Sequence, residues 1–293
     1  MNETEAWTIG RLLTWTTDFL RGHGVESPRL DAEVLLAAAR RCARIELYTA
    51  FDEPASDELR TAFRELVRRR ADGMPVAYLV GQREFYSLEF RVTPDVLIPR
   101  PETELLVVAL LDRIRERDSD VPAALADVGT GSGVIAVCAA KHSPDCRVTA
   151  IDISPSALAV AKQNAERHGV ADRVELVESD LFQTVDPARK FDLVVSNPPY
   201  VSRAEMGDLA REVRDHEPHV ALEAGEHGLD VIERLVAEAP DRLQPGGWLM
   251  MEISPPQVDE VGKRITADGR LVLSETIKDL AGRPRVVLAR KAN

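Results

Sequence analysis

The stretch Leu125-Ala-Asp-Val-Gly-Thr-Gly-Ser-Gly133 sets the fold class of this chain. Residues 125–128 read as an apolar strand, residues 129–133 as a glycine-rich turn, and residues 134–141 as a helix. Missing Cβ atoms at a strand-to-helix turn let the backbone approach a ligand closely. A dinucleotide-binding fingerprint needs its third glycine one residue later, where Val134 stands, so the turn argues against a nicotinamide cofactor.

Beyond residue 122 the chain alternates between strand and helix patterns. Apolar runs predict strands at residues 125–128, 147–151, 173–177, 191–195, 248–253, 271–276 and 285–289. Spacing and caps predict helices at residues 134–141, 154–168, 204–215, 229–243 and 256–268. This alternation predicts an α/β fold with a mostly parallel sheet covered by helices on both faces.

The first quarter of the chain has a different pattern. Amphipathic spacing predicts helices at residues 7–21, 28–40 and 56–70. The triplet Arg68-Arg69-Arg70 reads as a solvated helix end whose positive charges complement the helix dipole. We therefore expect a small helical bundle before the α/β part.

A hairpin is expected between these two parts. Residues 84–98 contain two apolar runs separated by Thr93-Pro94-Asp95, which reads as the turn. The resulting domains are a helical bundle at residues 1–74, a linker with the β-hairpin at residues 75–98 and an α/β domain at residues 99–293.

The charge of the chain bears on its partners. The chain has 37 Lys and Arg against 49 Asp and Glu, and residues 75–293 carry −10 of the net −12. Such a charge repels nucleic acid phosphates, so we expect no direct DNA binding. The three cysteines lack metal-ligand spacing and are expected to be reduced packing residues, with no metal site. No signal peptide or 18-residue apolar run is present, which predicts a soluble, cytoplasmic protein without membrane contact.

Two acidic residues stand at strand ends after the glycine turn. Asp152 follows Gly133 by 19 residues, where a carboxylate can accept hydrogen bonds from both ribose hydroxyls of a nucleoside. Asp180 ends the next strand, where a carboxylate or nearby backbone can read an adenine amine, with Leu181 as an apolar wall. Taken singly, each acid is better explained as a turn residue. In series, at the carboxyl ends of successive strands, they indicate a ligand crevice.

A second candidate site is Ser196-Asn197-Pro198-Pro199-Tyr200, which follows the apolar strand at residues 191–195. Two prolines offer no N–H, so the Pro198 carbonyl can point outward, and the Asn197 side chain adds another acceptor. These acceptors can hold the two protons of a planar NH2 group, with the ring of Tyr200 on its flat face. Taken alone, a proline-rich strand exit with Tyr200 as core filler explains the stretch equally well.

The order of these features resembles that of the S-adenosylmethionine-dependent methyltransferases that methylate planar nitrogens. A wider set of motifs is similar to the bacterial release factor glutamine methyltransferases, the PrmC or HemK family. The matching residues are 85–86, 97–104, 127–133, 197–200, 217–218, 221–222, 245–247 and 252–253. The similarity covers roughly residues 5 to 290, so it includes the expected bundle and hairpin.

The resemblance implies both a fold and a reaction. The implied fold is an N-terminal helical bundle, a hairpin linker and a Rossmann-like class I methyltransferase sheet with an antiparallel last strand pair. Because a glutamine side chain alone offers too little surface for specificity, we expect the bundle to take part in recognising the substrate protein. The implied reaction transfers a methyl group from S-adenosyl-L-methionine to N5 of the glutamine in the Gly-Gly-Gln motif of class 1 peptide chain release factors. S-adenosyl-L-homocysteine is the implied product.

The resemblance also implies roles for individual residues. The implied donor-binding residues are Gly129, Thr130, Gly131, Ser132, Gly133 and Asp152, with Asp180 and Leu181 at the adenine. The implied glutamine-binding residues are Asn197, Pro198, Pro199 and Tyr200. Among these, Asn197, Pro198 and Tyr200 are implied to be catalytic, and Asn197 is implied to touch the donor as well.

Two other functions are open to the same residues. The stretch at residues 196–200 suits an exocyclic amine of adenine or guanine, although the charge and the non-basic bundle argue against a nucleic acid substrate. A non-catalytic module could use S-adenosylmethionine as a sensor or structural ligand, although an intact 197–200 beside an intact glycine turn argues against it. We expect a monomeric enzyme whose partner is a class 1 release factor.

Overall fold

We describe the protein from a computed structural model, which covers residues 7–117, 121–267 and 269–292. The chain forms two compact units. One contains the chain up to Gln82 together with Ala210–His216, and the other contains Arg83–Leu209 and the chain from Glu217 onward. Residues 1–6 of the expected bundle and residue 268 of the last expected helix lie outside the described residues.

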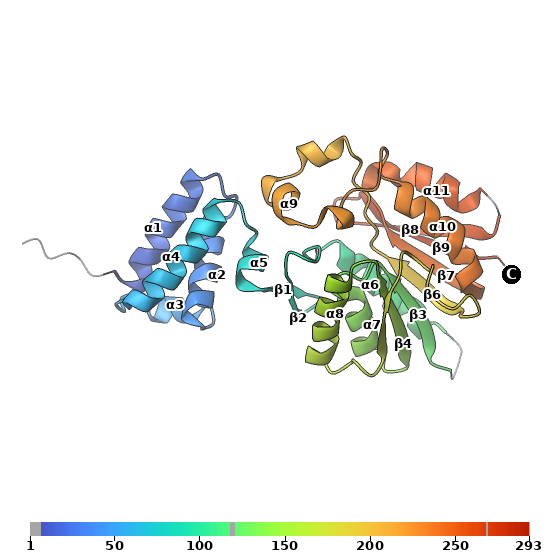
Figure 1. Ribbon diagram of the computed structural model, residues 1–293, viewed down its shortest axis with the longest axis horizontal. Helices are drawn as coiled ribbons and strands as arrows, with labels where there is room; N and C mark the ends of the chain where they lie inside the picture. The colour runs from blue at the N-terminus through green and yellow to red at the C-terminus, as the bar shows by residue number, and fades with distance from the viewer. Residues whose placement is uncertain (1–6, 118–120, 268, 293) are drawn as a thin grey trace, which may run out of the picture. The chain divides into compact units, whose positions relative to one another are not determined.

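The first unit is helical (Figure 1). Its elements are α1 (Ile9–Gly22), α2 (Pro28–Arg40), α3 (Glu46–Thr49), α4 (Asp57–Ala71), α5 (Val76–Val80) and, from later in the chain, α9 (Arg211–His216). The hydroxyls of Thr8 and Ser56 cap α1 and α4 by accepting hydrogen bonds from the N–H groups of Arg11 and Leu59. Apolar side chains from α1, α2, α3 and α4 form a separate core. The three helices expected from the amphipathic patterns are therefore confirmed.

The arginine triplet at the end of α4 differs from its prediction. Arg70 is 8% exposed and donates to Asp31 of α2 at 2.7 Å, and it pairs with Glu212 of α9 at 3.0 Å. Arg68 is exposed and pairs with Glu65 one turn earlier. The prediction of a solvated triplet was wrong for Arg70, because that side of α4 packs on α2 and an internal carboxylate needs a cation.

The hairpin consists of β1 (Gln82–Phe85) and β2 (Leu88–Arg91). Its turn is formed by Tyr86 and Ser87, whose φ angles are +50° and +58°. The turn expected at residues 93–95 was therefore misplaced. Two-residue turns with positive φ favour Asn and Gly, and neither Tyr86 nor Ser87 carries that signal. A tertiary contact holds the turn instead, since the Tyr86 N–H donates to Oε1 of Glu104 at 2.9 Å.

The second unit is built on a seven-stranded sheet with the order β5-β4-β3-β6-β7-β9-β8. Its strands are β3 (Ala123–Val128), β4 (Cys146–Asp152), β5 (Val174–Glu178), β6 (Phe191–Ser196), β7 (Leu243–Glu252), β8 (Leu271–Lys278) and β9 (Pro284–Lys291). The strands β5, β4, β3, β6 and β7 pair in parallel, whereas β9 is antiparallel to both neighbours. The expected sheet and its antiparallel last pair are confirmed.

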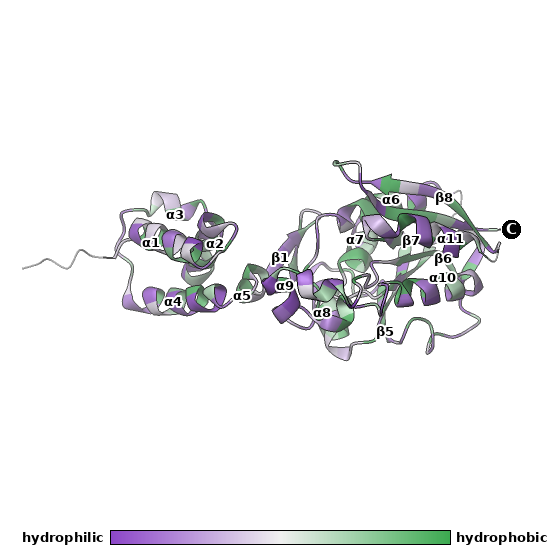
Figure 2. Cartoon of the chain, turned by 90° about the horizontal axis from the view of Figure 1, so that it is seen from above, coloured by the Kyte–Doolittle hydropathy of each residue, from purple (hydrophilic) through white to green (hydrophobic). Residues whose placement is uncertain are grey.

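Helices cover both faces of this sheet (Figure 1). They are α6 (Thr103–Arg115), α7 (Val134–His142), α8 (Pro155–Arg167), α10 (Asp230–Arg242) and α11 (Val258–Thr266). On β6, Leu193 and Val195 join the core with α6 and α7, whereas Val194 joins the core with α10 and α11. Burial on both faces explains the continuous apolar runs of the central strands, which carry the hydrophobic colour in Figure 2.

The helix expected at residues 204–215 is interrupted. A 3-10 turn, η1 (Glu205–Asp208), is separated from α9 by Leu209 and Ala210, and Leu209 is extended with φ −62° and ψ 147°. Both segments lie among the described residues and neither buries a side chain, so neither has an apolar face that would stabilise one continuous helix. Two further 3-10 turns are η2 (His219–Ala221) and η3 (Pro255–Gln257).

Candidate active site

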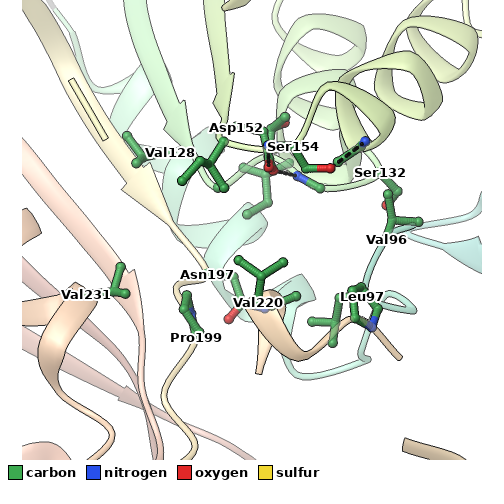
Figure 3. A pocket seen from close by; sticks show the side chains of 18 of the residues that line it. Val96, Leu97, Val128, Ser132, Asp152, Ser154, Asn197, Pro199, Val220 and Val231 are labelled. Atoms are coloured by element: carbon green, nitrogen blue, oxygen red, sulfur yellow. Dashed lines mark hydrogen bonds between the residues drawn. The ribbon is translucent and has the colours of Figure 1, made fainter. Parts of the chain in front are cut away.

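A cavity of about 270 Å³ opens at the carboxyl ends of the parallel strands (Figure 3). Ligands of open α/β sheets bind at this edge, where the loops after successive strands converge. The cavity brings together Gly129, Thr130, Gly131, Ser132, Asp152, Asp180, Leu181, Asn197 and Pro199 from the set expected at the donor and the amide. Three other residues of that set, which the structure also describes, do not line the cavity: Gly133, Pro198 and Tyr200.

Gly133 holds the glycine turn against a neighbouring helix. Its φ is +80°, a value that favours glycine, and it directly precedes α7. A Cβ at this position would lie 3.1 Å from Cβ of Ala161 in α8. Glycine is needed here for close packing between the turn and α8.

Asp152 ends β4 with its carboxylate at the cavity. Its Oδ2 accepts a hydrogen bond from the Gly131 N–H at 2.8 Å, and its Oδ1 accepts one from the Ser154 N–H at 2.9 Å. Burial raises the pKa of Asp152, against the opposing effect of these backbone donors. Each carboxylate oxygen keeps a second lone pair, so the group can still accept hydrogen bonds from two ligand hydroxyls.

Asp180 and Leu181 line the same cavity after β5. The carboxylate of Asp180 pairs with Arg234 of α10 at 3.0 Å, so a ligand that uses it shares it with a cation. Leu181 has a φ of +50°, which is uncommon for a leucine and requires support from the surrounding packing. Ile153, which the sequence analysis missed, also lines the cavity and is 52% exposed although apolar. The sequence signal that could have identified Ile153 is its position directly after Asp152, the acid at the end of a strand.

Asn197 presents its carbonyl oxygen to the cavity. Its Nδ2 donates to Oγ1 of Thr103 at 3.1 Å, and this hydroxyl donates to Oε2 of Glu252 at 2.7 Å. Within the described part of the chain, the Oδ1 atom of Asn197 accepts no hydrogen bond. Figure 3 shows Asn197 beside Pro199 at the cavity. An open acceptor at this edge is available to a ligand N–H group.

Pro198 and Tyr200 lie deeper. Pro198 is buried, and the partly buried ring of Tyr200 packs on the core beneath α10 and α11. The Tyr200 hydroxyl lies 3.5 Å from Oε1 of Glu252, and burial raises the pKa of this phenol well above its ordinary value. Tyr200 thus has the contacts of a core side chain. That its ring packs on a substrate amide stays a prediction.

Comparison with known proteins adds to this geometry. A family model described as "PrmC N-terminal domain" matches residues 11–81, and a second, described as "Methyltransferase small domain", matches residues 102–216. The release factor glutamine methyltransferase of Rhodopirellula baltica is 52% identical over 288 residues, which cover 98% of this chain and 97% of the relative. That of Geobacter sulfurreducens is 46% identical over 257 residues, 88% of each chain. The chain belongs to the release factor glutamine methyltransferase family.

A solved structure supports the fold assignment for this family member. The T. thermophilus 16S rRNA N2 G1207 methyltransferase, solved with AdoMet and guanosine, has a TM-score of 0.53 and 19% identity. The match covers 72% of this chain and 49% of that chain. At this identity the likeness concerns the fold, which agrees with the expected class I methyltransferase architecture.

Three contacts within the site of this family member were not foreseen from sequence. The first is at Glu217, which is buried and accepts hydrogen bonds from the Ile98 N–H at 3.1 Å and from Arg100 at 2.5 Å. These bonds hold the loop after Glu217 at the cavity rim. The second contact is the Thr103 and Glu252 pair described above. Residues 97–104, 217–218 and 252–253 were recognised only as matching motifs.

The third contact involves Asp127 at the end of β3. Its Oδ2 accepts hydrogen bonds from the hydroxyl of Thr130 at 2.7 Å and from the N–H of Ala136 at 3.1 Å, so it ties the glycine turn to α7. Its Oδ1 is buried and, among the described residues, has no hydrogen-bond partner. Burial raises the pKa of Asp127 to about 7.

Three further features of the described residues concern metal ions, cysteines and membranes. Those residues contain no group of three His, Cys, Asp or Glu side chains that could hold a metal ion. The cysteines are free, with Cys138 and Cys146 buried, which agrees with their expected packing role. No helix in the described ranges is both long and apolar enough to cross a membrane.

Proposed function

We propose that this chain transfers the methyl group of S-adenosyl-L-methionine to N5 of the glutamine in the Gly-Gly-Gln motif of class 1 peptide chain release factors, in the cytoplasm. Family membership supports this function. One observation carries it: Asn197 gives its N–H to Thr103 and keeps Oδ1 for the cavity, beside the glycine turn. An acceptor at that place suits the NH2 group of an amide.

The residues of the cavity fit the donor. Gly131 brings backbone to the cavity without a Cβ, Asp152 has acceptors for ribose hydroxyls, and Ile153 and Leu181 offer apolar walls to a flat base. When bound, S-adenosyl-L-methionine supplies an electrophilic methyl group on a sulfonium. The remaining work of the site is to orient the substrate nitrogen toward that methyl group.

Asn197 and Pro198 would orient the glutamine amide. An amide nitrogen is a weak nucleophile because its lone pair is delocalised into the carbonyl. If Oδ1 of Asn197 and the Pro198 carbonyl accept its two N–H groups, the nitrogen is held in one orientation, and the positive charge that develops on it is stabilised. No general base is needed before the attack, because the N–H becomes acidic only after the methyl group has arrived.

Replacement of Asn197 by alanine tests this function. With purified release factor and saturating donor, we expect the single-turnover rate to fall by about 10² or more, with donor affinity unchanged in calorimetry. Peptide mass should locate the wild-type methyl group on the glutamine of Gly-Gly-Gln. A folded Asn197→Ala protein that reacts at the wild-type rate would refute the assignment, and a methyl group found on another residue would refute the substrate.

We also propose that the helical bundle, residues 1–74, docks the release factor. A groove of about 510 Å³ between α1 and α4 is lined by Trp7, Trp15, Phe19, Arg60, Arg64 and Arg68, among others. Trp15 is 50% exposed and stacks on Phe19 with ring centroids 5.0 Å apart. Exposed aromatic and arginine side chains are the residue types that most often anchor protein interfaces.

A pair of substrates separates docking from catalysis. Trp15→Ala should raise KM for the intact factor and leave KM for a short Gly-Gly-Gln peptide unchanged. Ile45→Ala is the matched control, because Ile45 is 71% exposed in the same bundle but lies outside the groove. Equal effects of Trp15→Ala on both substrates would contradict docking at the groove.

A further inference from the structure

Glu252 is a buried carboxylate directly behind the site. It ends β7, is 1% exposed, and lies among Thr103, Tyr200, Glu102 and Arg285. Arg285 is engaged elsewhere, with Asp279 at 3.0 Å and Glu102 at 3.6 Å. Among the described residues no cation forms an ion pair with Glu252. A carboxylate buried without a paired cation is costly to the fold, so its presence calls for a role.

The hydrogen bonds of Glu252 have a fixed direction when the group is ionised. An ionised carboxylate only accepts, so the Thr103 hydroxyl must donate to Oε2, across 2.7 Å. The Thr103 oxygen then faces Asn197 with a lone pair, and Asn197 must offer Nδ2 to it, across 3.1 Å. With Nδ2 committed, the Oδ1 atom of Asn197 is the one left for the cavity.

We propose that Thr103 and Glu252 are positioning residues for methyl transfer, and that the ionised Glu252 carboxylate, acting through the Thr103 hydroxyl, holds the Asn197 amide with its Oδ1 toward the substrate. This inference rests on the proposed role of Asn197 in binding a substrate NH2 group. It assigns neither Thr103 nor Glu252 a contact with the substrate.

Protonation of Glu252 removes this constraint. A neutral carboxyl group can donate to the Thr103 oxygen, which frees the Thr103 hydroxyl to donate to Oδ1 of Asn197. The side-chain amide of Asn197 can then rotate by half a turn and present its NH2 group to the cavity. That group is a donor, whereas the N–H groups of the substrate amide need an acceptor. Glu252→Gln allows the same reversal at every pH, because the glutamine amide also carries N–H groups.

The pH range of the effect follows from the surroundings of Glu252. Burial raises the pKa of this carboxyl to about 7, and Glu102 adds to the rise, whereas Thr103, Arg285 and Tyr200 oppose it. The single-turnover rate should therefore increase as pH rises through about 7. Asp127 has a pKa in the same range, so the pH dependence must be compared with that of Glu252→Gln, which keeps Asp127.

We call the hydrogen-bonded series Glu252, Thr103 and Asn197 the relay. Matched variants test it by methylation of release factor at saturating donor. Thr103→Val keeps the side-chain shape and removes the hydroxyl, whereas Thr103→Ser keeps the hydroxyl. We expect Thr103→Val and Glu252→Gln to lower the single-turnover rate about 10- to 100-fold with donor affinity unchanged, and Thr103→Ser to retain most of it. Glu252→Gln should also lose the increase in rate near pH 7. If serine is as slow as valine, or the increase persists in Glu252→Gln, the proposal is overturned.

A second measurement does not depend on methylation. The side-chain 15N–1H2 signals of Asn197, assigned from their absence in Asn197→Ala, should shift with pH around 7 in the wild-type protein and stay constant in Glu252→Gln. Signals that do not respond to pH in the wild type would overturn the relay. If these signals respond but wild-type protein leaves the release factor unmethylated, the relay stands and the proposed substrate fails.

Discussion

Glu252→Gln should change the pH dependence of protein stability in a defined direction. Burial raises the pKa of Glu252 from 4.5 to about 7, so between these values the folded protein holds a proton that the unfolded chain has lost. The stabilisation from that proton is fully present below pH 4.5 and is lost as pH rises to about 7. Glutamine cannot ionise, so the variant escapes this loss.

The size of the effect follows from the same two values. At about 1.4 kcal/mol per pKa unit, the difference between 4.5 and about 7 corresponds to about 3 kcal/mol. The free energy of unfolding of Glu252→Gln, relative to that of the wild type, should therefore increase by about 3 kcal/mol between pH 4.5 and pH 8.5. The same variant should be slower in catalysis, so stability and activity change in opposite directions.

Urea unfolding of both proteins across this pH range measures the difference. Asp127, with a pKa of about 7, titrates in both proteins, so its contribution cancels in the subtraction. A difference in unfolding free energy that stays constant from pH 4.5 to 8.5 would refute the assignment of a strongly raised pKa to Glu252. It would also remove the physical basis for the expected increase in rate near pH 7.

Three further predictions concern other parts of the chain. Asp152→Ala should weaken donor binding by about 1 to 3 kcal/mol, and unchanged affinity in calorimetry would contradict it. Gly133→Ala should destabilise the α/β unit by about 1 to 3 kcal/mol, because of its φ of +80° and the Cβ contact of 3.1 Å to Ala161; urea unfolding tests this. Arg70→Met should destabilise the bundle by about 3 kcal/mol, because it leaves Asp31 buried without its cation. A variant whose thermal unfolding temperature equals that of the wild type would disprove this.

Local patterns in the sequence predicted most of the elements. Strands buried on both faces gave continuous apolar runs, and amphipathic helices of the bundle gave the helical period, so both were visible in single stretches. The two misplaced features lacked such a local signal. Tyr86 and Ser87 adopt a turn that their residue types do not favour, and residues 204–215 have no buried face.

Candidate site residues were found where chemistry coincides with a strand end. Asp152 ends β4, Asn197 directly follows β6 and Leu181 lies in the loop after β5, and in a parallel sheet all strand ends on one edge converge. Arg70 was misjudged for the complementary reason, since its partners Asp31 and Glu212 belong to other helices. A residue whose role depends on distant partners has no pattern of its own.

The amino-acid sequence by itself predicted the alternation of strands and helices, the glycine turn and an acceptor at Asn197, because each of these predictions depends on neighbours within a few residues. Only the tertiary structure decided what orients that acceptor. Asn197 is separated from Thr103 by 94 residues, and Thr103 from Glu252 by 149, so folding of β6, α6 and β7 side by side is what joins them. The hydrogen bonds themselves are local in space, and sequence spacing carries no information about them.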